Sequence, residues 1–174
     1  TTIFGRHAQT LSDTLTCYGI STKIVSSLRQ VDEAAIRKLM WVSIMWLLCN
    51  DYDKNDGGAP ITVAAVHETR GNDVRRLVED TLPAANLLVQ QYHKSEDQDG
   101  SCSSIDNVDG VIEYMEAYSF SMPNAIPNKM LAIDEFAQRN GMLLSMSSKI
   151  PQPLHRAMVK KVVGYMPEYG ASVE

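Results

Sequence analysis

The longest apolar stretch of the chain lies in its first third. Residues 39–49 are apolar with one exception, Ser43, and they include both tryptophans of the chain, Trp41 and Trp46. A helix that is apolar on every side is buried on most of its sides. The pattern therefore predicts a central buried helix at residues 32–50, around which the other elements of the fold pack.

Apolar residues recur at helical spacing through most of the remaining chain. Capping residues and turn formers divide it into about eight further helices, which begin near His7, Ser21, Pro60, Asn72, Pro83, Asp106, Asn128 and Pro153. Apolar and other residues alternate in part of the segment 61–70, as they would in a strand, but the sequence indicates no second strand that would pair with it. We therefore expect an all-α fold in a single globular domain, residues 1–174, with a two-lobed helical body as the alternative.

The N-terminal end carries an apolar pair and then an amphipathic helix. Residues 1–6 are expected to form an arm that docks, through Ile3 and Phe4, on its own core or on a neighbouring molecule. The helix that follows has one apolar stripe, made of Ala8, Leu11, Leu15 and Tyr18. This stripe is expected to face the core. At the other end of the chain, residues 167–174 are expected to form a loose tail.

The balance of charge bears on nucleic-acid binding. A net charge of −5 argues against a protein that coats nucleic acid through its overall field. Charge is nevertheless segregated, because residues 94–116 are acidic whereas residues 149–166 are basic, and a second basic cluster lies at residues 70–76. The candidates for contact with phosphates are Arg70, Arg75, Arg76, Arg156, Lys160 and Lys161. Local contact with RNA is therefore compatible with an acidic chain.

The patterns of common catalytic and metal sites are incomplete in this chain. The loop at residues 51–58 is rich in aspartate, but neither register of an EF-hand supplies the bidentate glutamate at its twelfth position. His67 and Glu68 begin the zinc motif HExxH, but Gly71 stands where the second histidine belongs. No Gly-x-Ser-x-Gly elbow, Walker loop or dinucleotide-binding glycine pattern occurs. We therefore expect no catalytic residue, no metal site and no cofactor.

Cysteine usage favours a reducing compartment. The three cysteines are odd in number and far apart, and no CxxC pair occurs. No N-terminal signal peptide is visible, and the apolar run at residues 39–49 is too short for a membrane span, which needs about 20 residues. The expected location is intracellular, in the cytoplasm.

Three functional hypotheses remain. The first is a non-enzymatic structural or assembly protein that binds itself or a protein partner, and its sharper version is a nucleocapsid- or coat-type subunit that holds single-stranded RNA. The second is a helical-bundle enzyme, or a ligand- or metal-binding protein, with a site between helices at His67, Glu68 and His93 beside the acidic loop. The third is a regulatory interaction module whose groove for a partner helix uses Met142, Met146 and the connector after them. The missing catalytic signatures favour the first.

Overall fold

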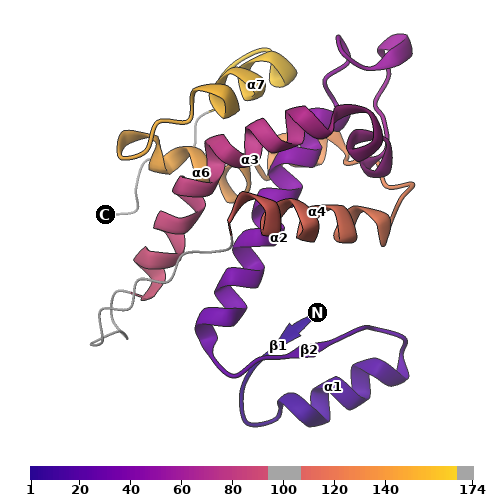
Figure 1. Cartoon of the computed structure of the whole chain (residues 1–174), viewed down its shortest axis with the longest axis vertical. Helices are drawn as coiled ribbons and strands as arrows, with labels where there is room; N and C mark the ends of the chain where they lie inside the picture. Colours follow the sequence, from indigo (N-terminus) through magenta and orange to yellow (C-terminus); the bar gives the residue numbers. More distant parts are fainter. Residues whose placement is uncertain (94–106, 168–174) are drawn as a thin grey trace.

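The computed structural model describes residues 1–93 and 107–167, and it shows one all-α domain (Figure 1). Within these ranges the helices are α1 (Ala8–Cys17), α2 (Leu28–Cys49), α3 (Val63–His93), α4 (Val108–Phe120), α5 (Lys129–Asp134), α6 (Asn140–Leu144) and α7 (Pro153–Val163). Short 3-10 helices lie at η1 (Asp56–Gly58), η2 (Phe136–Gln138) and η3 (Ser145–Ser148). Two short strands, β1 (Thr2–Ile3) and β2 (Lys23–Ile24), pair in parallel. The predicted all-α class is confirmed. The predicted tail, residues 167–174, lies outside the described residues except for Pro167.

Helix α2 is the central helix that the apolar run predicts. It begins at Leu28, ahead of the predicted start, because the Ser27 hydroxyl accepts a hydrogen bond from the backbone N–H of Gln30 and caps the helix there. Trp41 is 7% exposed and Trp46 is fully buried. Figure 1 shows α3, α4, α6 and α7 gathered around the upper part of α2, whereas its lower end projects from them. The expected central buried helix is confirmed for the C-terminal half of α2.

Two clusters of buried side chains meet at α2. The larger cluster joins Met40 and Met45 to the apolar faces of α3 and α4. The smaller cluster joins Trp46 and Leu47 to Val159 and other buried residues of the C-terminal segment. Because apolar partners face α2 from several directions, its C-terminal half has no polar stripe.

Helix α3 is continuous at one of two predicted breaks and kinked at the other. The separate helix expected from Pro83 is wrong, since α3 runs through that position. The boundary expected just before Asn72 corresponds to a kink at Arg70, where φ is −128° and ψ is 25° and two helical pieces meet. A proline inside a helix costs about 3 kcal/mol. Each fully buried valine or leucine returns about 1.5–3 kcal/mol. The buried side chains on this part of α3 are Val74, Leu77, Val78, Leu82, Leu88 and Val89. Their burial outweighs the proline.

The last third of the chain is more broken than its sequence predicts. Asn128 caps α5 as expected, and its side chain accepts hydrogen bonds from two backbone N–H groups. Short helical pieces then replace the single predicted helix. Pro153 begins α7 as predicted, and Gly164 ends it with a φ of 89°. The predicted cap of α4, Asp106, lies outside the described residues, and the Asn107 side chain caps that helix.

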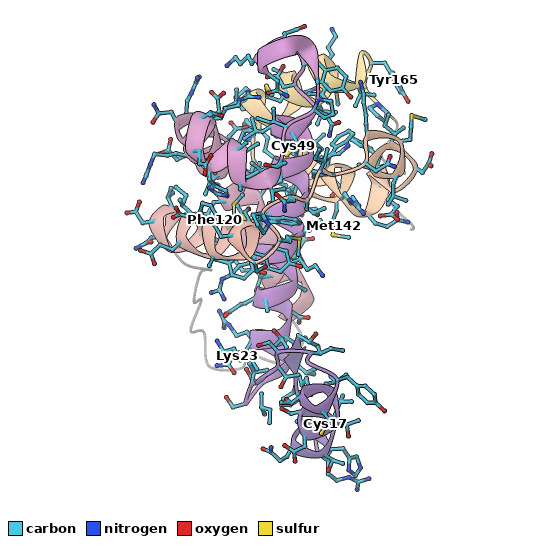
Figure 2. The ribbon with its side chains drawn as sticks, turned by 90° about the vertical axis from the view of Figure 1, so that its right-hand side faces the viewer. Cys17, Lys23, Cys49, Phe120, Met142 and Tyr165 are labelled. Atoms are coloured by element: carbon cyan, nitrogen blue, oxygen red, sulfur yellow. The ribbon has the colours of Figure 1, made fainter. Side chains whose placement is uncertain are left out.

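Residues 1–27 form a small unit at the foot of α2, called here the N-terminal unit. Strand pairing closes it, with Lys23 N donating to Thr1 O at 2.8 Å and Val25 N donating to Ile3 O at 2.9 Å. The helix predicted from Ser21 is therefore wrong, because this segment pairs with a distant one and helical spacing does not reveal such a contact. Both figures show the N-terminal unit below the helical body (Figures 1 and 2).

Candidate interaction surfaces

The Arg70 side chain is buried where α3 meets the C-terminal end of α2. Its Nη2 lies 2.9 Å from both Asp51 Oδ2 and Asp73 Oδ2, and its Nη1 donates to the carbonyl oxygen of Leu48 at 2.9 Å. Only 6% of the side chain is exposed. Burial alone would raise the pKa of Asp73, but the hydrogen bonds and charges of Arg70 and Lys54 together outweigh it and hold that pKa below its usual value. Arg70 therefore serves the fold and presents no guanidinium face to a nucleic acid.

Lys161 belongs to the same network. Its Nζ lies 2.6 Å from Asp51 Oδ1 and 3.5 Å from Asp53 Oδ2. The contact with Asp51 raises the pKa of Lys161, which keeps the amine charged. The Asp51 carboxylate, which is 1% exposed, thus binds one cation from α3 and one from α7. We conclude that Lys161 first of all anchors α7 to the end of α2.

Arg75 and Arg76 are exposed but point to different flanks of α3. Successive residues on a helix are about 100° apart. Arg75 turns toward α4, where its Nη2 lies 2.6 Å from Asp109 Oδ1, and it also lies 3.9 Å from Glu79. Arg76 has no such ion pair within the described residues. The two arginines that are adjacent in sequence do not form one basic cluster.

Helix α7 lies along the Arg76 flank of α3. The backbone N–H of His155 donates to Asp80 Oδ2 at 2.8 Å, which places the first turn of α7 against α3. Arg76 lies one turn before Asp80, and Arg156 directly follows His155, so the contact brings the two arginines to one region of the surface. Arg156 and Lys160 are exposed on successive turns of α7. We call Arg76, Arg156 and Lys160 the basic surface.

Two of the candidate enzyme residues, His67 and Glu68, line a polar hollow of about 420 Å³ on α3, and His67 also enters a buried hydrogen-bond network. His67 Nε2 lies 3.0 Å from Ser119 Oγ, which also accepts a hydrogen bond from Trp41 Nε1 at 2.8 Å. A serine beside a histidine suits nucleophilic catalysis, but Ser119 is fully buried, so no substrate reaches its hydroxyl. Burial lowers the pKa of His67 more than the nearby Glu116 carboxylate raises it. The hydrogen bonds among Trp41, Ser119 and His67 therefore link α2, α4 and α3.

The other residues of the enzyme hypothesis add no ligand set. Glu68 is exposed on α3. The side chain of His93 and the acidic residues 94–106 lie outside the described part. Among the residues that the structure describes, no three histidine, cysteine, aspartate or glutamate side chains are grouped closely enough to hold a metal ion.

An apolar groove of about 450 Å³ runs beside the N-terminal half of α2. One wall is a stripe of α2, and the other wall comes from η2 and α6. The lining residues are Asp32, Ala35, Ile36, Lys38, Leu39, Trp41 and Val42 of α2, together with Gln138, Arg139 and Met142. Figure 2 shows Met142 beside α2, above the N-terminal unit. Met142 and Met146 were both candidates for a helix-binding groove. Both pack partly buried against the larger core cluster, and of the two only Met142 lines the groove. We call this hollow the α2–α6 groove.

The N-terminal unit leaves an unusual share of its apolar side chains in contact with water. Half of the large hydrophobic residues that the described chain exposes lie before residue 29: Phe4, Leu11, Tyr18, Ile20, Ile24 and Leu28. Leu11 is 48% exposed and Tyr18 is 79% exposed, although the apolar stripe of α1 was expected to face the core. Neither core cluster contains a residue before Ile36. The predicted burial of that stripe is wrong at Leu11 and Tyr18, whereas Ala8 is buried and Leu15 is half-buried.

No protein-family model, curated protein or solved structure matches this chain. Every helix in the described ranges lacks the length or the apolar run that crossing a membrane requires.

Proposed function

We propose that this chain is a structural subunit that associates with copies of itself through its N-terminal unit. The observation that carries the proposal is the exposure of the α1 stripe and its apolar neighbours on a unit that takes no part in either core cluster. Contiguous exposed apolar patches of more than a few hundred Å² mark interaction sites in folded proteins. The Trp41–Ser119–His67 network supports no competing catalytic role, because its serine is buried.

The energetics favour covering these side chains. By the areas typical of such residues, the six together expose roughly 500 Å² of apolar surface. Removing that area from water at about 25 cal/mol per Å² is worth on the order of 10 kcal/mol before the entropic cost of association. Such a gain is of the size that a specific complex needs.

The test is the mass of the full chain in solution, measured by light scattering across a concentration series. We expect the mass to rise above that of one chain as concentration increases. Tyr18→Asp is expected to shift the transition at least tenfold to higher concentration, because it places a charge in the contact. The matched control is Tyr165→Asp, which changes a tyrosine that is 54% exposed at the other end of the chain. A chain that stays monomeric at every concentration would contradict the proposal and favour the regulatory module.

A second candidate function is contact with single-stranded RNA at the basic surface. It is favoured by the position of Arg76 beside the exposed face of α7, where Arg156 and Lys160 make no ion pair with any described residue. A cation that is not already paired is free to displace counterions from phosphates. The net charge of −5 then makes such contact local and strongly dependent on salt.

Titration of labelled single-stranded RNA at several salt concentrations tests this version. Replacing Arg156 and Lys160 together by glutamine should weaken binding and lower the magnitude of the log–log salt slope by about 1.4, at about 0.7 per phosphate contact. The same replacement at Lys23 and Lys149, two exposed lysines elsewhere, is the control of equal charge. No binding at low salt would remove the RNA version and leave self-association untouched.

A further inference from the structure

The α2–α6 groove has the form of a site for a helix. It is about 450 Å³ in volume and its floor is apolar. Ala35, Leu39 and Val42 follow one another on α2 at intervals of four and three residues, so they form one continuous stripe. The small side chain of Ala35, exposed on this stripe, permits a close approach by another backbone. A helix that enters a groove of this kind uses apolar anchors at i, i+4 and i+7.

Helix α1 has such anchors and no groove of its own. Leu11, Leu15 and Tyr18 stand at i, i+4 and i+7, and the two at the ends are exposed. The only charged residue within α1, Asp13, lies on the opposite face, where its carboxylate accepts a hydrogen bond from Gln9 at 2.7 Å. The anchor face therefore brings no charge to the apolar stripe of the groove, whose charged lining residues are Asp32, Lys38 and Arg139.

We propose that α1 of a second copy of this chain occupies the α2–α6 groove, and that the exchange is reciprocal. This inference rests on the proposed self-association and names its contact surfaces. One chain carries both an uncovered apolar helix and an unfilled apolar groove, so two copies satisfy each other. Pairing of β1 with β2 and the burial of Ile3 hold the N-terminal unit at the foot of α2, away from the groove of the same chain. Reciprocal contacts of this kind close a two-fold dimer.

The area of the exchange fits a stable dimer. A ten-residue helix is about 15 Å long, and its water-accessible surface is about 13–15 Å across, so laying half of that surface in a groove covers on the order of 300–350 Å². The groove loses a similar area from water. Two reciprocal contacts then bury roughly 1,200–1,400 Å² in total, which is at the lower end of the range for a standard specific interface. A single contact would bury about half of that and would be weak.

The test mixes two variants of the full chain, each damaged on one side of the contact. Leu11→Glu places a charge on the apolar face of α1 and leaves the groove unchanged. Ala35→Glu places a charge in the groove and leaves α1 unchanged. Each alone is expected to be monomeric by light scattering at a concentration where the wild type is dimeric. Their mixture retains one good α1–groove pair, so we expect the mass of a dimer to return, at a concentration at least tenfold higher than the wild type needs. Met130→Glu, which alters a residue 63% exposed outside both surfaces, is the control and is expected to dimerise normally.

The outcomes separate the two proposals. A wild type that never exceeds the mass of one chain overturns both self-association and the exchange. A wild type that dimerises, with a mixture that stays monomeric or with Ala35→Glu still dimerising, overturns the exchange alone. Circular dichroism establishes that each variant is folded, and Ala35→Lys replaces Ala35→Glu if the latter is not. A charge of either sign in the groove has the same expected effect.

Discussion

At the scale of single residues, charged and polar side chains are buried wherever they join segments of the body. Arg70 binds two carboxylates and a main-chain carbonyl, and Asp51 accepts cations from both α3 and α7. A basic residue in a polar stretch predicts an exposed cation, because nothing local in the sequence reports a partner from another segment. This is why Arg70 was a candidate for binding phosphate.

Replacing Arg70 by methionine should therefore cost stability. The change leaves Asp51 buried with one fewer partner, and removal of one member of a buried pair typically costs about 3–5 kcal/mol. Arg76→Met, a matched change at an exposed site, should change stability by about 0.5 kcal/mol or less. Urea unfolding measures both free energies. Equal losses for the two variants would mean that the buried network does not hold α2, α3 and α7 together.

His155 shows the same principle with an uncharged group. It is fully buried, with Nδ1 3.0 Å from Gln152 Oε1 and Nε2 2.7 Å from the side-chain amide of Asn140. The Gln152 amide nitrogen in turn donates to the Leu143 carbonyl oxygen at 2.6 Å. Burial lowers the pKa of His155 to about 3, so the ring is neutral in the folded protein. The histidine therefore connects α7 to α6 without carrying a charge.

This burial predicts how stability depends on pH. Because the folded-state pKa lies below the ordinary value of 6.5, the unfolded chain binds a proton that the folded chain does not, and stability falls as pH drops below 6.5. Between pH 7 and pH 5 the loss from this group is about 2 kcal/mol, at about 1.4 kcal/mol per pH unit. Urea unfolding at both pH values should show that His155→Gln loses less than the wild type over this interval. The exposed His7→Gln should lose as much as the wild type, and an unchanged loss in His155→Gln would contradict the assignment.

At the scale of elements, the sequence predicts long helices well and their ends poorly. The apolar run of α2 is long enough to identify a buried helix, because a helix that is apolar on every side must be covered on most sides to keep it from water. Pro83 is an ordinary marker of a helix end, yet α3 passes through it, since the apolar stripe on either side of it faces one continuous partner. The marker at Asn72, by contrast, lies beside the kink at Arg70. Local markers fail where tertiary burial is larger than their cost. Strand β2 could not be found from its own residues, because its partner residues in β1 lie 21 positions earlier in the chain.

One buried hydroxyl, that of Ser119, links α2, α3 and α4 in addition to their apolar contacts. Ser119→Ala leaves the buried Nε1–H of Trp41 without an acceptor, which should cost about 1–3 kcal/mol. Ser121→Ala removes an exposed hydroxyl one helical position beyond the end of α4 and should cost no more than about 0.5 kcal/mol. Thermal unfolding followed by tryptophan fluorescence compares the two. A Ser119→Ala protein as stable as Ser121→Ala would show that this hydrogen bond is not part of what joins the helices.

At the scale of the whole molecule, the chain divides into a packed body and a unit that its own core does not cover. Periodicity identifies the apolar stripe of α1 in the sequence, but it does not say whether that stripe meets its own core or another molecule. The basic surface was likewise only partly predictable. Arg156 and Lys160 are exposed as expected, whereas adjacency in sequence hid the separation of Arg75 from Arg76. The packing of segments decides which side chains lie together on a surface. The pattern of charges along the sequence does not predict that packing.

Self-association through the N-terminal unit is the central claim, and hydrogen exchange at two protein concentrations tests it most directly. One concentration lies well below the mass transition and the other well above it. We predict that amides of α1 and of the N-terminal half of α2 exchange more slowly in the concentrated sample, while those of α3 between residues 74 and 89 do not change. Exchange at α1 and at residues 28–42 that is the same in both samples would contradict the account.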